Sequence, residues 1–475
     1  MSNKLAISII LGLSIATHFI FFGLPKETVF DEVHFGKFVS AYFSHEYYFD
    51  IHPPLGKLLI AGVGKIVNFS PEFDFSQIGE KYNNNKYMAL RSLPTLAGTL
   101  LPLIIYLLCL EIGFKRRTAL LAGLLIVFEN SILVQSRLIL MDAFLILFGF
   151  IALLFYFKFR NKNKLNYLLL TGIFSALAFS IKWTGMAFLG IVVILELLHL
   201  FRNVMTNKDK TFESTAVFST EKHLVLGPVV LRKPLKSLIF VFRNFLPSVL
   251  FLVIIPALIY FSIFVIHFSL LTKSGTGDAF MTSAFQSDLI GNPNQDNTSV
   301  GHISILNKFL ELNEQMYISN QGLTATHSYS SKWYTWPLMI RPIYYWVSGN
   351  AKIYFLGNPI IWWFSTMAVV FAIIYSVFNK FKDKTSDLLL GMYLASFLPF
   401  IFIGRVMFLY HYMSALIFAI MLLAYNISQS SNNKWLYAIL IATSIITFVY
   451  FAPLTYGLPI IPNHQAGRLW LTSWQ

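Results

Sequence analysis

"LAISIILGLSIATHFIFFGL" (residues 5–24) is a run of twenty residues without a formal charge, and most of its side chains are apolar. A helix of about twenty such residues is long enough to cross the hydrocarbon core of a bilayer. Ten further apolar runs of similar length follow it, at residues 88–110, 118–136, 139–157, 166–182, 184–201, 246–268, 358–378, 386–404, 409–427 and 435–452. The sequence therefore predicts an all-α polytopic membrane protein with about eleven transmembrane helices.

The composition agrees with this fold class and disfavours several functions. Of the 475 residues, 56% are hydrophobic and only 12% are charged, whereas soluble domains carry about 25% charged residues. The single cysteine, Cys109, allows no disulfide within the chain. The sequence has no GxxxxGK[ST], HExxH or CxxC motif, so neither nucleotide hydrolysis nor zinc proteolysis has support. The basic residues are divided among short loops, which disfavours binding of nucleic acid.

A twelfth apolar stretch, "PLGKLLIAGVGKIVNF" (54–69), is interpreted differently. It has only sixteen residues and contains Lys57 and Lys65. Charged side chains in the bilayer core are costly. We therefore expect an interfacial helix here, within the first loop, and not a transmembrane span.

The distribution of positive charge predicts the orientation of the chain. With eleven spans and a cytoplasmic N-terminus, the cytoplasmic segments hold 20 of the 36 Lys and Arg residues, including the loops 111–117, 158–164, 202–245 and 379–384. This agrees with the excess of positive charge found in cytoplasmic loops. The outer side then carries the first loop (25–87), a large loop (269–357) and a tail (453–475). We accordingly divide the chain into an N-terminal transmembrane catalytic half (1–268), the large outer loop (269–357) and a C-terminal four-helix region with its tail (358–475).

The first outer loop begins with ionisable residues, in "FDEVHFGKF" (30–38). An isolated pair such as Asp31 and Glu32 is usually a helix cap or a solvated pair, but here His34 and Lys37 follow within one turn or two. A carboxylate beside cationic groups is expected to stay ionised near neutral pH. It can then act as a general base toward a hydroxyl group.

Further polar side chains occur at the predicted outer ends of the spans. They belong to Arg137, Asp142, Lys182, Arg341, Arg405, Tyr410 and His411. Each alone is typical of an interfacial anchor, but their shared side indicates a polar cavity. Arg and Lys suit a phosphate, and aromatic faces suit a sugar ring or a lipid tail. These residues favour an outward-facing membrane enzyme that acts on a phosphate-bearing lipid.

Seven strings of the sequence resemble the dolichyl-phosphate-mannose protein O-mannosyltransferase family, which belongs to the C-type glycosyltransferases. The strings are "DEVHFGKF", "YYFDIHPPLGKLL", "ENSILVQSRLILMDAF", "SIKWTG", "SGTGDAFMTSAFQ", "SSKWYTWPLMIRPIYYW" and "FLYHYMSALIF". The resemblance implies eleven transmembrane helices with interfacial helices in the first outer loop. It also implies transfer of mannose from a polyprenyl phosphate to Ser or Thr hydroxyls of proteins, with inversion at the anomeric carbon.

The same resemblance implies roles for individual residues. Asp31 resembles the catalytic base and Glu32 its essential neighbour, while Arg137 resembles a residue linked to donor binding. Similarity to related lipid-phosphate sugar transferases places Lys57 near the donor phosphate. His52 and Asp142 are assigned to the same donor site. The remaining candidates are expected to line the cavity: His34, Lys182, Arg341, Arg405, Tyr410 and His411. No metal-binding residues are predicted and no cofactor is required, although a divalent cation is left open.

One region departs from the eukaryotic form of the family, which carries a β-trefoil insert of roughly two hundred residues in the large loop. Only 46 residues separate Gln286 from Trp333 here. The short loop resembles that of prokaryotic members and favours a prokaryotic plasma membrane over the endoplasmic reticulum. This short loop leaves open a lipid or glycan acceptor in place of a protein. The family resemblance also leaves a dimer open. A secondary transporter is the alternative from another class, but no inverted repeat is evident.

Overall fold

The computed structural model describes the whole chain except residues 1, 214–244, 325, 432, 462–463 and 465. Within the described residues, eight helices are long and apolar enough to cross a membrane, some of them together with an adjoining 3-10 or π turn. They are α4 (Lys86–Ile112), α7 (Asp142–Lys162), α9 (Met186–Glu213), α11 (Ile255–Leu270), α14 (Pro359–Phe378), α15 (Lys384–Phe397), α16 (Met413–Ser428) and α17 (Asn433–Tyr456). The prediction of an all-α polytopic membrane protein is confirmed.

The remaining expected spans correspond to shorter or broken helices. The run 118–136, expected as one helix, is divided into α5 (Arg116–Val127) and α6 (Asn130–Ser136), which meet at a bend of 60°. The helix breaks because the Glu129 side chain accepts a hydrogen bond from the backbone N–H of Ile132 (3.0 Å) and caps a new helix. Two shorter apolar helices, α1 (Asn3–Phe19) and α8 (Leu165–Phe179), overlap the other two expected runs. The count of eleven spans and the orientation of the termini stay predictions, and residues 214–244 of the basic segment 202–245 lie outside the described residues.

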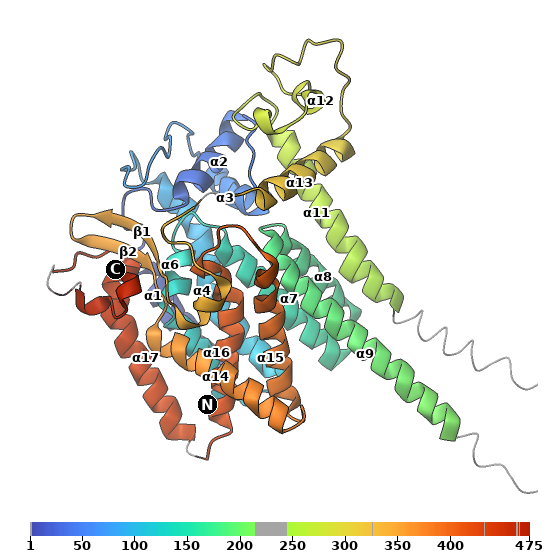
Figure 1. Cartoon of the computed structure of the whole chain (residues 1–475), viewed down its shortest axis with the longest axis vertical. Helices are drawn as coiled ribbons and strands as arrows, with labels where there is room; N and C mark the ends of the chain where they lie inside the picture. The colour runs from blue at the N-terminus through green and yellow to red at the C-terminus, as the bar shows by residue number, and fades with distance from the viewer. Residues whose placement is uncertain (1, 214–244, 325, 432, 462–463, 465) are drawn as a thin grey trace, which may run out of the picture.

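The expected outer pieces of the chain gather at one end of the helices, opposite the N-terminus (Figure 1). The first loop contains α2 (Glu32–Ser44) and α3 (Leu55–Ile66), and the large loop contains α12 (Ser283–Gln286) and α13 (Ile305–Gln321). Backbone bridges join Glu46 to Lys273 and Ala351 to Pro459, so the first loop, the large loop and the tail are in contact. The twelve residues of α3 cover about 18 Å, which is too short to span a membrane.

The large loop also contains an antiparallel hairpin that the sequence analysis did not predict. Its strands are β1 (Ile343–Ser348) and β2 (Ala351–Phe355). The register shifts between Tyr344 and Trp346. The residue in between, Tyr345, is buried, and its hydroxyl donates a 2.5 Å hydrogen bond to Gln135 at the end of α6. The hairpin therefore carries a tyrosine from the large loop into the helix bundle.

Two glycines of "SGTGD" (274–278) bring the large loop against the first loop. A Cβ on Gly275 would lie 2.3 Å from the carbonyl oxygen of Tyr47, and one on Gly277 would lie 2.4 Å from the carbonyl carbon of Tyr48. Asp278 closes the turn by accepting hydrogen bonds from the backbone N–H of Gly275 and from the Asn292 amide. This string is thus a packing contact between two loops within the described structure.

Candidate active site

Asp31 lies at the start of α2, where the chain turns out of the first loop. Phe30 before it has a positive φ of 47° and stacks on Tyr345 with ring centroids 4.0 Å apart. The ring anchors the turn and places Asp31 at the N-cap position of α2, yet the Asp31 side chain makes no capping hydrogen bond. Among the described residues no other hydrogen bond reaches this carboxylate. It is half-buried and available to a ligand.

The surroundings of Asp31 change its acidity. Burial raises the pKa of its carboxyl from 3.8 to about 7; the positive charge of Lys182 opposes this shift, and Asp142 and Asp50 add to it. From the sequence, nearby cations were expected to keep this carboxylate ionised near neutral pH, but the effect of burial on its pKa outweighs theirs. A carboxylate with a pKa near neutrality is well matched to accept a proton from a hydroxyl group.

The ion pair of Lys182 and Asp142, whose charges both act on Asp31, joins the turn after α8 to the start of α7. Lys182 Nζ lies 2.9 Å from both carboxylate oxygens of Asp142, and the Gln135 amide donates a further hydrogen bond of 2.8 Å to Asp142. The Lys182 ammonium also lies over the Tyr410 ring, 5.2 Å from its centroid. The predicted site residues Asp142, Lys182 and Tyr410 are therefore brought together with Asp31.

A second buried ion pair comes from the "YYFDIHPPLGK" string of the first loop. Lys57 Nζ pairs with the Asp50 carboxylate and donates to the carbonyl oxygen of His52 (2.8 Å). The His52 pKa is held well below its usual value by burial and by the positive charges of Lys182 and Lys57. His52 is therefore neutral near pH 7, and the Lys57 ammonium is already engaged within the protein.

Arg405 and His411 complete the polar cluster on the side of α15 and α16. Both interact electrostatically with His52. Burial lowers the Arg405 pKa from its usual value. Among the described residues its guanidinium, which is half-buried, has no hydrogen-bond partner. His411 is fixed by stacking on Trp336, with ring planes 11° apart.

An apolar cavity of about 510 Å³ leads away from Arg405 between α9 and α15. Trp183, Met186, Ile194 and Phe400 supply apolar walls, and Asn320 and Gln321 of α13 supply amides. A cavity of this size and lining suits a long apolar chain. Arg405, at one end of this cavity, would face the polar head group attached to such a chain.

Glu32 has surroundings opposite to those of its neighbour Asp31. It is fully buried and forms a 2.7 Å ion pair with Arg91. Its two oxygens also accept hydrogen bonds from the Tyr82 hydroxyl and from the backbone N–H groups of Val29 and Ile139. With five hydrogen bonds the carboxylate is saturated, and it holds the first loop against α4 and the turn before α7.

Two predicted site residues, Arg137 and Arg341, have side chains that are engaged elsewhere, and a third, His34, is exposed. The Arg137 guanidinium donates to the carbonyl oxygens of residues 20 and 21 and lies 4.5 Å from the centroid of the Tyr456 ring. Arg341 donates to the carbonyls of Ser328 and Ser473. His34 is exposed on α2. The donor-binding role of Arg137 stays a prediction, but its side chain is occupied at the end of α1.

Four residues of the site were not predicted from the sequence: Asp50, Arg91, Gln135 and Tyr345. Asp50 and Gln135 lie within strings that were singled out, seven residues before Lys57 and before Asp142 respectively. Each forms its key contact with that residue. Arg91, in contrast, lies inside an apolar run 59 residues after its partner Glu32, and no local pattern connects the two. The signal that the sequence offers for Arg91 is that an ionisable residue occurs inside an expected transmembrane run, where such residues usually have a function.

Comparison with known proteins identifies the family. Residues 8–272 match the family model described as dolichyl-phosphate-mannose-protein mannosyltransferase, and residues 305–474 match the C-terminal four-transmembrane region of protein O-mannosyltransferase. The chain is 36% identical over 300 residues to dolichyl-phosphate-mannose–protein mannosyltransferase 4 of Candida albicans, and 32% identical over 294 residues to protein O-mannosyl-transferase 2 of Danio rerio. These alignments cover 61% and 60% of this chain but only 36% and 35% of the relatives.

The fold agrees with a solved structure from yeast. A chain of the Saccharomyces cerevisiae protein O-mannosyltransferase Pmt1–Pmt2 complex, bound to the sugar donor, superimposes with a TM-score of 0.85 at 20% identity. The match covers 100% of this chain and 93% of the yeast chain. The expected C-type glycosyltransferase fold is thus confirmed. Since the first family model alone matches more than half of its residues, this chain belongs to the dolichyl-phosphate-mannose-protein mannosyltransferase family.

Proposed function

We propose that this chain transfers mannose from a dolichyl-type polyprenyl phosphate to Ser or Thr hydroxyls of a protein, with Asp31 as the general base. The family and the names of its relatives support the reaction. The observation that carries the role of Asp31 is its carboxylate, which lacks a hydrogen bond among the described residues and has a pKa of about 7 beside a cluster of cations.

In the proposed step, the acceptor oxygen forms a bond to the anomeric carbon while the bond from that carbon to the phosphate oxygen breaks. The Asp31 carboxylate takes the hydroxyl proton. Attack from the face opposite the phosphate inverts the anomeric carbon. The products are the mannosylated hydroxyl and the polyprenyl phosphate, which carries one more negative charge than the phosphodiester donor.

Arg405 is the cation we assign to the departing phosphate. Lys57 is paired with Asp50 and Lys182 with Asp142, so their charges are largely neutralised within the protein. Arg405 has no such partner among the described residues and faces the apolar cavity that would hold the prenyl chain. A fixed cation at the leaving group stabilises the charge that develops in the transition state.

The setting of the reaction is part of the proposal. We infer that the membrane is a prokaryotic plasma membrane, because the short large loop resembles that of prokaryotic members. We place the site on its outer side and the N-terminus in the cytoplasm, because the basic loops favour that orientation. The yeast structure is a complex of two proteins, and we propose that this chain also acts as a dimer. The mass of the purified protein in detergent would test that point.

The proposed function is tested by supplying the purified chain with radiolabelled polyprenyl-phosphate-mannose and two acceptors, a Ser/Thr-rich peptide and a glycolipid. Label on the peptide, in the anomeric configuration opposite to that of the donor, is the expected result. Label on the glycolipid alone would replace the protein acceptor by a lipid. Absence of transfer to either acceptor would contradict the assigned reaction.

A further inference from the structure

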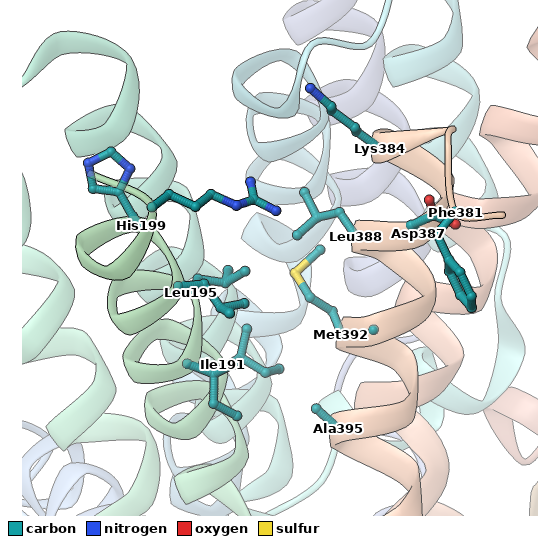
Figure 2. Close-up of a pocket in the computed structure, with 13 residues that line it drawn as sticks. Ile191, Leu195, His199, Phe381, Lys384, Asp387, Leu388, Met392 and Ala395 are labelled. Carbon is teal, nitrogen blue, oxygen red and sulfur yellow. The ribbon is translucent and has the colours of Figure 1, made fainter. Parts of the chain in front are cut away.

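The apolar cavity at Arg405 is one half of a longer groove between α9 and α15. A second cavity of about 610 Å³ shares Ile191, Ile194 and Ala395 with the first and continues toward the other end of the two helices. Figure 2 shows this second half, with α9 on one side and α15 on the other. Because the two helices are antiparallel, their spans Trp183–Arg202 and Lys384–Phe402 place Arg202 beside the start of α15.

The far end of the groove has a cationic rim. His199 and Arg202 of α9 and Lys384 of α15 line this end of the groove, and Figure 2 shows His199 and Lys384 on the two opposite helices. One carboxylate, Asp387, also lines it; its Oδ1 accepts a 2.5 Å hydrogen bond from Ser376. A span of twenty residues covers about 30 Å. The rim thus lies about one bilayer thickness from Trp183, which lines the Arg405 half of the groove.

The groove is open toward the membrane along its side. Ile194 and Leu198 are 54% and 51% exposed, and Phe381 at the rim is 65% exposed. Such large apolar side chains are in contact with lipid chains when the helices are in a bilayer. An acyl chain can therefore enter sideways and lie against α9 and α15.

We propose that the Arg202–Lys384 end of this groove binds an anionic glycerophospholipid, with its phosphate at the two cations and an acyl chain along Ile191 and Leu195. An isoprenoid tail that enters from Arg405 is uncharged at its far end, so it would not pair with the cations there. The phosphate of a phospholipid in the leaflet at this end would pair with them, because basic side chains at headgroup depth attract anionic lipids. The inference stands on the groove and its charges, and it does not depend on the chemistry assigned to Asp31.

The first test measures lipid retention on the full chain in detergent by native mass spectrometry, after titration with phosphatidylglycerol or phosphatidylcholine. The unmodified chain should retain phosphatidylglycerol in preference to phosphatidylcholine. The double variant Arg202→Ala/Lys384→Ala should lose about fivefold in affinity for each cation removed. Lys382→Ala is the matched control, since Lys382 is exposed at the same end of the molecule but does not line the cavity.

A second test places a bulky side chain in one half of the groove or in the other. A Cβ added at Gly391 or at Gly190 would have no heavy atom within 4 Å, so a larger side chain fits without a clash at that position. Gly391 lines the cationic half and Gly190 the Arg405 half. Gly391→Leu should reduce the retention of phosphatidylglycerol, whereas Gly190→Leu should leave it unchanged.

The outcomes separate this inference from the proposed function. If the unmodified chain, the double variant and Gly391→Leu retained phosphatidylglycerol equally, the proposed lipid site would be wrong. Equal binding of phosphatidylglycerol and phosphatidylcholine would overturn the role of the cations. Neither readout uses the mannose donor, so a failed transfer assay leaves both measurements interpretable.

Discussion

Asp31 and Glu32 are adjacent in the chain but serve different purposes. The Asp31 carboxylate is half-buried and lacks hydrogen bonds among the described residues, whereas the Glu32 carboxylate is buried and saturated. From the sequence, both residues were predicted to be catalytic. The surroundings of Asp31 support its proposed role as the base, and we now propose Glu32 as a positioning residue, because both of its oxygens are engaged in hydrogen bonds within the protein.

The pH dependence of transfer follows from the acidity of Asp31. Its pKa is raised to about 7, and only the deprotonated form accepts a proton. We therefore expect kcat/KM to rise tenfold per pH unit below that value and to level off above it, since kcat/KM reports the free enzyme. A profile that is flat between pH 5 and pH 8 would contradict the assignment.

Stability distinguishes the two carboxylates. A folded-state pKa above the unfolded value means that Asp31 favours folding in its protonated form, and this contribution is lost as the pH rises through about 7. Asp31→Asn should therefore unfold at an equal or higher temperature than the unmodified chain at pH 8. Glu32→Gln breaks a buried ion pair with Arg91 and should cost about 3–5 kcal/mol. Thermal unfolding in detergent measures both, and equal destabilisation by the two variants would refute this distinction.

Arg405 and Arg341 form a matched pair for testing the phosphate site. The first faces the cavity, and the second is bound to backbone carbonyls of the large loop and the tail. A hydrogen bond to a charged group contributes about 1.5–3 kcal/mol. Arg405→Ala should therefore weaken donor binding roughly 10- to 100-fold, and Arg341→Ala should leave it nearly unchanged. Equal donor affinity of Arg405→Ala and the unmodified chain would remove Arg405 from the site.

At the scale of elements, the site depends on the large loop lying on the first loop. Gly277 is packed against the backbone between Tyr48 and Phe49, where a Cβ has no room. Gly277→Ala should separate the two loops and destabilise the fold by about 1–3 kcal/mol. Gly301→Ala, at an open position of the same loop, is the control. Faster proteolysis of the large loop in Gly277→Ala, but not in Gly301→Ala, would report the separation.

The bend between α5 and α6 shows where prediction of elements fails. The apolar run 118–136 has the length of one span, and nothing in its periodicity indicates a break. The break depends on Glu129, which caps α6 and also accepts a hydrogen bond from the backbone N–H of Asn358, 229 residues away. A contact of that sequence separation is invisible to a local pattern. The hairpin of β1 and β2 was missed for a related reason, since its aromatic residues equally suit a membrane interface.

At the scale of the whole molecule, the fold class was predictable because apolar runs of spanning length are a strong signal. The gathering of the outer loops at one end followed from the same runs and from the short length of α3. The pairing of residues within the site was harder to predict from the sequence. The pairs Glu32–Arg91 and Asp142–Lys182 join residues 59 and 40 positions apart, and such pairs are fixed by helix packing. Burial also raises the pKa of Asp31 above the value expected beside cations, and burial depends on the complete fold.

The most direct test of the account compares single-turnover transfer by the unmodified chain and by Asp31→Asn, with donor binding measured on the same samples. Radiolabelled polyprenyl-phosphate-mannose and a Ser/Thr-rich peptide serve as substrates. We predict that Asp31→Asn binds the donor with the affinity of the unmodified chain and unfolds at an equal or higher temperature. It should transfer label at least roughly 100-fold more slowly, because a general base usually contributes a factor of this size. Transfer at a rate close to that of the unmodified chain would contradict the central claim that Asp31 accepts the proton.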